Sequence, residues 1–336
     1  MHSPAADLGP KRLRAGAGTL DPSLAAKTVG AAPALDSQVA TETSSFSSLA
    51  TKYIEEGRLD QAERVLRQTL EIGEMVFGRT DDRLENSLEE LAAFYCKHAK
   101  YPPAEPLLER LVSIRARTLS VFDATMLTTI DQLADVYSRD DKLARAEALY
   151  KTLLKRQWQH GNEQLNLAAI TTLKKLADVY YRQNDYSAAE SVYLRALSME
   201  EIAFGAYANE LRGTLKLLAT IYNAQAKYPL AAFALTRRLS ILEGADGEDA
   251  LSVADCLTTL ADIYTRMDRK SDGEPFYHRA LSIYQQSKGD HTTIINALTL
   301  KVRLLYPPSR VKSTTAKAQS TTVQDLVVHW SELLHQ

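Results

Sequence analysis

The chain has 336 residues, of which 45% are hydrophobic and 24% are charged, and its formal net charge is −2. These are the proportions of an ordinary soluble protein, and the near-neutral charge argues against nucleic-acid binding driven by overall charge. No run approaches the roughly 20 apolar residues of a membrane span. The two cysteines, Cys96 and Cys256, are far apart in the chain, which excludes a disulfide scaffold and favours a reducing, cytoplasmic location.

Residues 1–38 are predicted to form a disordered leader. They are rich in Ala, Gly, Pro and Ser and contain few large apolar residues, so folding would bury too little surface to offset the lost chain entropy. A basic cluster at Lys11, Arg12 and Arg14 is not followed by an apolar core. The leader is therefore not predicted to be a secretory signal.

A short pattern, Leu-Ala-x-x-Tyr, recurs along residues 39–306. Its spacing places the three residues on one face of a helix. Successive matches are 42 or 43 residues apart, which indicates an array of repeats rather than a bias of composition. The matches begin at Leu49, Leu91, Leu133, Leu176, Leu218 and Leu260.

Each repeat is predicted to be a hairpin of two helices. A small residue stands 13 positions after each leucine, where the second helix must approach the first closely, and a large residue follows one helical turn later. The small residues are Ala62, Ala104, Ala146, Ala189, Ala231 and Gly273, and the large ones are Leu66, Leu108, Tyr150, Tyr193, Leu235 and Tyr277. A seventh repeat ends early, because Arg303 takes the alanine position and Pro307 and Pro308 stop the helix. Residues 39–306 are thus predicted to form six hairpins plus a degenerate capping helix.

The sequence also predicts where the second helices begin and end. Asp60, Ser187 and Ser271 are each followed three residues later by a glutamate, an arrangement that caps a helix N-terminus. Glycines after the second helices are expected to close them in the left-handed conformation. These glycines are Gly78, Gly161, Gly205, Gly244 and Gly289.

Two further segments follow the array. Residues 307–321 are predicted to be a polar linker, and residues 322–336 an amphipathic helix. Its apolar stripe consists of Val323, Leu326, Val327, Trp330, Leu333 and Leu334. This helix could cover the apolar side of the incomplete seventh repeat, or it could be a free motif for a partner or for self-association.

The pattern resembles the tetratricopeptide repeat, in the 42-residue form found in kinesin light chains. The resemblance covers about residues 40–306 and is strongest after Tyr101, in a second helix with an A-E-P-L segment and an I-R ending. It implies an all-α fold, a right-handed superhelical solenoid of tetratricopeptide helical hairpins. It also implies a protein–protein interaction scaffold. Residues 1–40 show no heptad pattern, so the coiled coil that would attach a kinesin light chain to its motor is not predicted.

No catalytic constellation stands out in the sequence. The seven histidines have no spacing typical of a metal site. Cys96 has only Lys97 and His98 beside it, and no strand precedes the glycines at 16 and 18. The sequence therefore predicts neither an enzyme nor a cofactor or metal site.

The concave surface of such an array is the predicted binding site. Residues two and five positions before and after each leucine should point into this groove. Their charge passes from acidic to basic along the array, so an acidic segment of a partner is predicted to lie beside the lysines. The candidate groove residues are Asp131, Asp135, Thr171, Lys174, Asp178, Tyr181, Lys216 and Asn223.

A structural interpretation of the same charges is open. Three aspartates stand four residues before an arginine and could simply pair along their own helices. These pairs are Asp135–Arg139, Asp178–Arg182 and Asp262–Arg266. The favoured function is a scaffold that binds a peptide segment of a partner. The alternative is a regulatory sensor whose array changes curvature on binding a peptide or ligand and thereby controls an effector.

Overall fold

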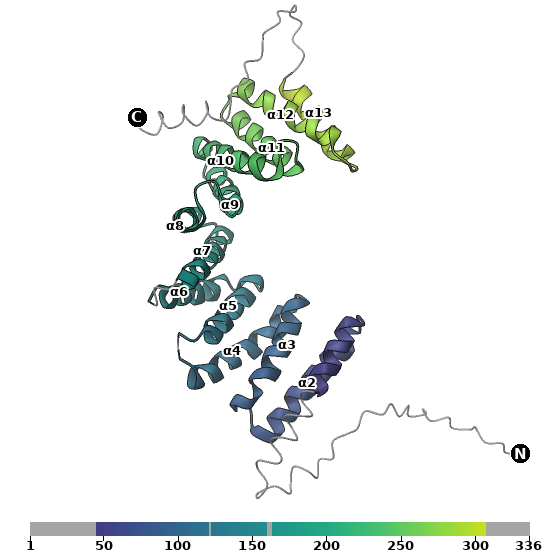
Figure 1. Cartoon of the computed structure of the whole chain (residues 1–336), viewed down its shortest axis with the longest axis vertical. Helices are drawn as coiled ribbons and strands as arrows, with labels where there is room; N and C mark the ends of the chain where they lie inside the picture. The colour runs from purple at the N-terminus through teal and green to yellow at the C-terminus, as the bar shows by residue number, and fades with distance from the viewer. Residues whose placement is uncertain (1–44, 121, 160–162, 307–336) are drawn as a thin grey trace, which may run out of the picture. The chain divides into compact units, whose positions relative to one another are not determined.

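The computed structural model describes residues 45–120, 122–159 and 163–306 (Figure 1). They divide into two compact units, residues 45–97 (unit 1) and the described residues of 98–306 (unit 2). All regular elements in these ranges are helical, which confirms the all-α class. The predicted leader 1–38, linker 307–321 and C-terminal helix 322–336 lie outside the described residues.

Unit 1 contains one hairpin and the first helix of the next repeat. A helix over residues 45–55 precedes α2 (Leu59–Phe77), and the short 3-10 helix η2 (Asp82–Leu84) leads into α3 (Glu85–Lys97). Helix α2 packs against α3. The Arg67 Nε donates a hydrogen bond of 2.7 Å to the hydroxyl of Tyr95, whose ring is buried.

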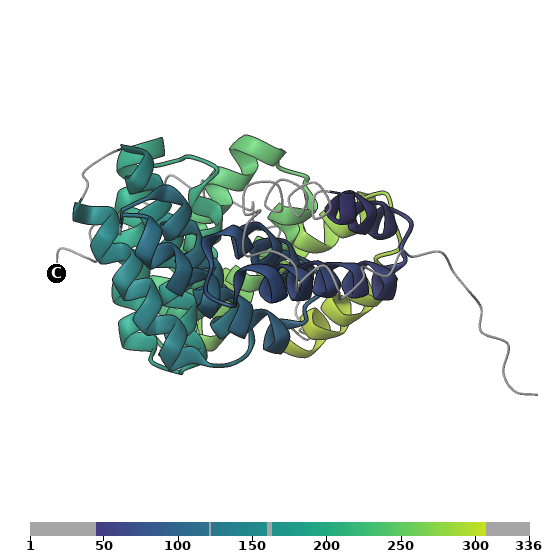
Figure 2. The same cartoon turned by 90° about the horizontal axis from the view of Figure 1, so that it is seen from below.

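Unit 2 is a run of helices in which each helix contacts the next. The succession can be followed by label in Figure 1 and by colour, from blue through teal to yellow-green, in Figure 2. The helices are α4 (Tyr101–Thr118), α5 (Ala124–Arg139), α6 (Leu143–Gln159), α7 (Glu163–Arg182), α8 (Tyr186–Phe204), α9 (Leu211–Ala224), α10 (Tyr228–Asp246), α11 (Leu251–Arg266), α12 (Lys270–Gln286) and α13 (Thr292–Leu305).

The repeated packing positions are buried as predicted. The five alanines at the small position are 0% exposed, and the large residues that follow them are at most 4% exposed. Gly273 is also buried, and a Cβ added there would lie 3.1 Å from the backbone oxygen of Ala261. The two helices of this hairpin therefore cross too closely for a larger side chain.

Each first helix is closed by a residue in the left-handed region, eight positions after the repeat leucine. The φ angle of these residues lies between 55° and 72°. Sequence analysis missed this position, because two of the six residues are alanines, which rarely adopt that conformation. The six residues are Gly57, Ala99, Asp141, Asn184, Ala226 and Asp268.

The predicted capping boxes are wrong. Helices α2, α8 and α12 begin one residue before Asp60, Ser187 and Ser271, which therefore lie inside the first turn. The residue with a positive φ ends the first helix abruptly. The second helix therefore starts one residue before the polar residue that was expected to cap it. At α8 the capping group is Asp185, whose carboxylate accepts a hydrogen bond from the backbone N–H of Ala188.

The predictions for the closing glycines are partly confirmed. Gly78 and Gly205 end α2 and α8 with φ angles of 84° and 96°. Helix α10 continues through Gly244 and ends at Gly247, so the prediction for Gly244 is wrong. Gly289 has a φ of 141° and lies three residues beyond Gln286, where α12 ends. Gly161 is outside the described residues.

We predict that Ala226→Gly stabilises unit 2 by about 0.5–1 kcal/mol, because glycine adopts a positive φ without the steric cost that alanine meets. The midpoint of urea denaturation, followed by circular dichroism, measures this change. The same substitution at Ala148, which is exposed within α6, is the control and should destabilise by about 1 kcal/mol. Destabilisation by both substitutions would contradict the prediction.

Candidate interaction surface

In two repeats of unit 2, an aspartate of the first helix pairs with a tyrosine of the second helix. The Tyr150 hydroxyl donates a hydrogen bond to Asp135, and the Tyr277 hydroxyl donates one to Asp262. In the repeat of α7 and α8, burial raises the pKa of Tyr193, and the charge of Asp178 raises it further. Asp135 and Asp262 therefore contribute to the packing of their own hairpins.

The two positions of this pair vary together along the chain. The aspartate stands two residues after the repeat leucine and the tyrosine 17 residues after it. Wherever the second position holds a leucine, the first holds no aspartate. The three repeats that lack both the aspartate and the tyrosine carry Thr51 with Leu66, Ala93 with Leu108, and Thr220 with Leu235.

Lys175 forms ion pairs with two acidic residues, Asp131 and Asp135, that were predicted to line the groove. Its Nζ donates hydrogen bonds to Asp131 at 2.8 and 3.0 Å and to Asp135 at 2.8 Å. Burial raises the pKa of Asp131, although the bonds from Lys175 act in the opposite direction. Burial alone would lower the pKa of Lys175, but its bonds to the two carboxylates raise that pKa overall. These carboxylates therefore serve the contact between neighbouring repeats, α5 and α7.

Lys174, the first lysine of the predicted basic region, is also engaged. Its Nζ lies 2.9 Å from a carboxylate oxygen of Glu200 on α8. The side chain of Glu200 is only 2% exposed, so Lys174 neutralises a buried charge. The structure thus gives Lys174 a role inside its own repeat.

Three more candidate groove residues lie on α7. Thr171 and Asp178 are exposed, and Tyr181 is half-buried. The ring of Tyr181 lies 5.6 Å from that of Tyr186, measured between centroids. Their exposure leaves Thr171 and Asp178 accessible to a partner.

The aspartates and arginines do not pair along their own helices, so that structural interpretation is wrong for these residues. Arg182 donates a hydrogen bond of 2.6 Å to the backbone oxygen of Ser138 and pairs with Asp141. Asp262 accepts a hydrogen bond from Lys301 on α13. Asp135, Arg182 and Asp262 are paired between repeats instead.

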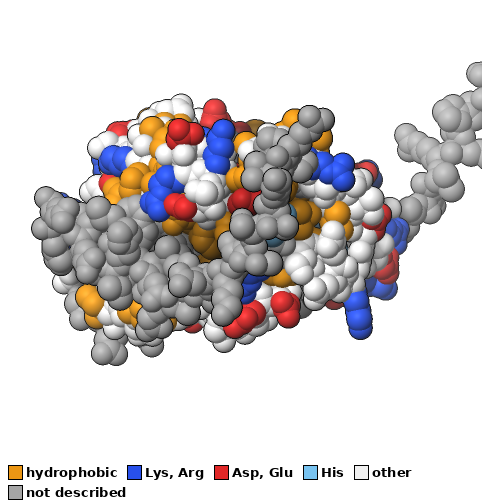
Figure 3. Space-filling view, turned by 90° about the horizontal axis from the view of Figure 1, so that it is seen from above, with side chains coloured by type: hydrophobic (Ala, Val, Ile, Leu, Met, Phe, Trp, Pro, Cys, Tyr) orange, Lys and Arg blue, Asp and Glu red, His pale blue; other side chains and the backbone are white. Residues whose placement is uncertain are grey.

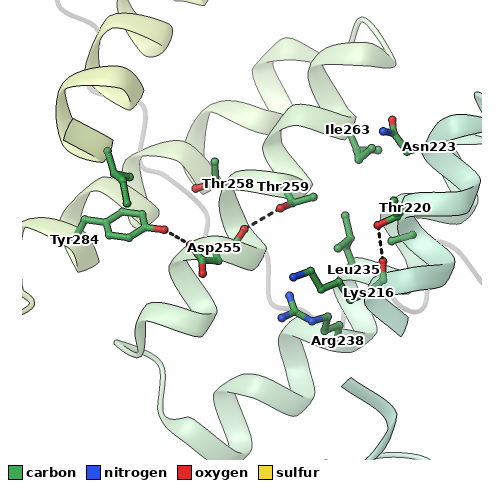
Figure 4. Close-up of a pocket in the computed structure, with 12 residues that line it drawn as sticks. Lys216, Thr220, Asn223, Leu235, Arg238, Asp255, Thr258, Thr259, Ile263 and Tyr284 are labelled. Atoms are coloured by element: carbon green, nitrogen blue, oxygen red, sulfur yellow. Dashed lines mark hydrogen bonds between the residues drawn. The ribbon is translucent and has the colours of Figure 1, made fainter. Parts of the chain in front are cut away.

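The last two candidate groove residues, Lys216 and Asn223, line a pocket of about 450 Å³ in unit 2 (Figure 4). It is formed by residues of α9 to α13, with Leu235 and Ile263 among its apolar walls. Arg238 of α10 also lines it. Sequence analysis did not identify Arg238, because only the first helices were expected to reach the groove.

The charge of this pocket is positive. Within the described residues neither Lys216 nor Arg238 forms an ion pair, and the Nε of Arg238 is buried without a hydrogen-bond partner. The pocket's one acidic side chain, Asp255, accepts a hydrogen bond from the Tyr284 hydroxyl. Figure 4 shows Lys216 and Arg238 extending from α9 and α10 into the same part of the pocket.

The rest of the described surface is mixed in character. On the face seen from the α13 end, hydrophobic side chains reach the surface among basic and acidic ones (Figure 3). In the part of the chain that the structure describes, no group of three or more His, Cys, Asp or Glu residues is placed to hold a metal ion. No helix in these ranges is both long and apolar enough to cross a membrane.

We predict that Lys174→Met destabilises unit 2 by about 2 kcal/mol, because it leaves the buried Glu200 carboxylate without its cation. One oxygen of Glu200 already lacks a hydrogen-bond partner. Lys216→Met is the matched control: this lysine is exposed, and its loss should change stability by less than about 0.5 kcal/mol. Scanning calorimetry compares the two variants. Equal losses in melting temperature would show that the Lys174 pair is not required.

We also predict that unit 2 loses stability as the pH rises above about 10. Burial raises the pKa of Tyr137 from 10.0 to about 12 and also raises the pKa of Tyr150 and Tyr193. The unfolded chain releases these protons near its ordinary pKa whereas the folded chain keeps them, so stability is complete below that pKa and falls above it. Urea denaturation across this pH range measures the slope. Tyr150→Phe should make it shallower, and an unchanged slope would count against the argument.

Comparison with known families identifies the repeats. Two family models, each described as a tetratricopeptide repeat, match the chain, one over residues 122–202 and the other over residues 43–83 and 253–291. No curated protein matches the chain.

Several solved structures share the fold. The nearly identical repeats of a Podosopora anserina protein described as a kinesin light chain are 18% identical, with a TM-score of 0.54 over 61% of this chain and 97% of that one. BtubC (BKLC) from P. vanneervenii is 18% identical, with a TM-score of 0.52 over 83% and 98% of the two chains. A signal transduction ATPase from Pyrococcus horikoshii with a tetratricopeptide repeat sensor is 17% identical, with a TM-score of 0.59 over 78% and 38%.

These identities are low and show a common fold alone. The family models, the repeat length and the buried positions shared by all six repeats agree with one another. The matched residues are therefore tetratricopeptide repeats, and the described part of the chain has the helical-hairpin fold of such repeats with a period of about 42 residues.

Proposed function

We propose that this protein is a non-catalytic scaffold that binds a peptide segment of a partner protein along its first helices. Tetratricopeptide repeats generally mediate protein–protein interaction, and stacked repeats present extended surfaces suited to it. The observation that carries the proposal is the positively charged pocket of unit 2. It combines apolar walls with Lys216 and Arg238, two cations that form no ion pair with any described residue.

The charge of the pocket favours an acidic partner segment. Lys174 and Lys175 already hold carboxylates of the chain itself, so neither is free to attract a partner. Lys216 is exposed on α9 and remains available. An acidic segment would therefore lie near α9, one repeat further along the chain than Lys174, with Thr171, Asp178 and Tyr181 as the candidate contacts on α7.

A regulatory sensor is the second candidate function. The pocket volume of about 450 Å³ falls within the range of roughly 300–1,000 Å³ that is typical of ligand sites. The repeats of the Pyrococcus horikoshii ATPase are described as a sensor. A sensor must change shape on binding, so small-angle scattering with and without a bound peptide would distinguish it from a scaffold. Self-association through residues 322–336 stays a prediction.

A cytoplasmic location is part of the same proposal. Neither Cys96 nor Cys256 is joined in a disulfide, and cysteines outside disulfides are typical of a reducing compartment. Burial raises the pKa of Cys256, which keeps this thiol protonated and unreactive.

We predict that peptides selected from a random library against the full chain protect the backbone amides of α7, α9 and α11 from hydrogen exchange. A peptide that packs on the first helices would suppress local opening there. Its affinity should fall as salt is added, because the attraction to Lys216 is screened. Lys155, exposed on α6, provides the control: Lys216→Glu should weaken binding at least about tenfold, and Lys155→Glu should not. Failure to select any peptide, or protection confined to second helices, would contradict the scaffold function.

A further inference from the structure

Among the described helices of unit 2, α13 is the first helix that lacks a second helix of its own. The pairs α5 with α6, α7 with α8, α9 with α10 and α11 with α12 form complete hairpins before it. Helix α13, the yellow-green helix of Figure 1, packs against α12 and contributes Leu298, Val302 and Leu305 to the core. Since a repeat buries its apolar surface only when both of its helices pack together, one side of α13 is left without a described partner.

This side of α13, the open face, carries exposed leucines. Leu300 and Leu304 are 59% and 73% exposed, and they lie one helical turn apart on the same face. Ala297, at the turn before Leu300, is exposed as well. Neighbouring apolar side chains with this degree of exposure are typical of a surface that another segment covers.

The same two positions are polar in the complete repeats of unit 2. They lie two residues before and two residues after the repeat leucine, whose place Val302 takes in α13. On α11 the second position is Asp262, which accepts hydrogen bonds from Tyr277 of α12 and from Lys301. Leu304 cannot accept such bonds, so its covering segment must be apolar where α12 is polar. The polar pairs are Asp131 and Asp135, Lys174 and Asp178, Lys216 and Thr220, and Thr258 and Asp262.

The chain itself contains a segment of matching chemistry. The amphipathic helix predicted for residues 322–336 has one apolar stripe, which includes Leu326 and Trp330. Its acidic residues, Asp325 and Glu332, fall on the opposite face at helical spacing and would stay in water. Packing the stripe on α13 would therefore bury apolar side chains without burying a carboxylate.

The intervening linker is long enough to return this segment to α13. Residues 307–321 can span at most about 50 Å, whereas α13, with 14 residues, is about 21 Å long. The segment can thus reverse direction and lie beside Leu300 and Leu304. A tether of this length also gives it a roughly millimolar effective concentration, far above that of a second copy in dilute solution.

We infer that residues 322–336 dock on the open face of α13 of the same chain and cover Leu300 and Leu304. Arg303 stands where the complete repeats carry a small alanine, so the docked segment cannot cross α13 as closely as a second helix crosses its first helix. The contact depends on side chains and is reversible. It lies outside the proposed peptide site and does not depend on that function.

Tryptophan fluorescence of the full chain tests the docking. The variant Trp158→Phe leaves Trp330 as the only tryptophan. In this background Trp330 should emit at a shorter wavelength, and acrylamide should quench it several-fold less, than in the same chain unfolded by urea. Adding Leu300→Gln and Leu304→Gln should remove this protection and lower the melting temperature, because the covering contact is lost. Circular dichroism verifies that the helices remain.

Leu194→Gln is the matched control, because Leu194 is a 44% exposed leucine on α8. It should leave both Trp330 and the melting temperature unchanged. Protection of Trp330 that persists on dilution and is lost only with the two α13 substitutions supports the docking. Protection that disappears on dilution, together with a dimer in sedimentation, would assign the open face to a second copy and overturn docking within one chain. An exposed Trp330 before the α13 substitutions, or protection that survives them, would also overturn it.

Discussion

The close crossing of two helices in each hairpin is the constraint on which the rest of this structure depends. Ala146, Ala189 and Ala231 are 0% exposed at the crossing, and at Gly273 even a Cβ would approach the backbone of the facing helix at 3.1 Å. Since nothing larger than a methyl group fits there, the large side chain one turn later has to fill the space beside the crossing. The tyrosines do so, and Tyr150 and Tyr277 add a hydrogen bond to an aspartate of the first helix.

Much of the charge on the first and second helices serves to join one repeat to the next. Lys175 on α7 holds two aspartates of α5, and ion pairs of the same kind connect α10 with α8 and α12 with α10 through Arg237–Glu201 and Arg279–Glu243. Such charges are already satisfied and offer little to a partner. The candidate site therefore lies where a repeat departs from the common pattern, at Leu235 and its neighbours.

The sequence supported correct predictions for the helices and their buried faces because these depend on residues three to four positions apart, which repeat six times. It misplaced the starts of α2, α8 and α12 because the turn before each is set by a left-handed residue, and Ala99 and Ala226 give no sign of that conformation. It also misassigned the partners of Asp135 and Arg182. The observed partners, Lys175 and Asp141, lie about 40 residues away in the sequence, beyond the reach of any pattern within one helix.

The sequence by itself therefore determined the all-α repeat architecture, because helical periodicity and the need for a small residue at each crossing are local requirements. The tertiary structure alone decided which charges stay free. Lys174 and Lys216 occupy equivalent positions in consecutive repeats, yet Lys174 pairs with a buried glutamate of α8 and Lys216 faces a pocket. That difference arises from residues on the second helices, because the position of Glu200 in one repeat is taken by Leu242 in the next. Their distance from the lysines becomes short only when the hairpins fold.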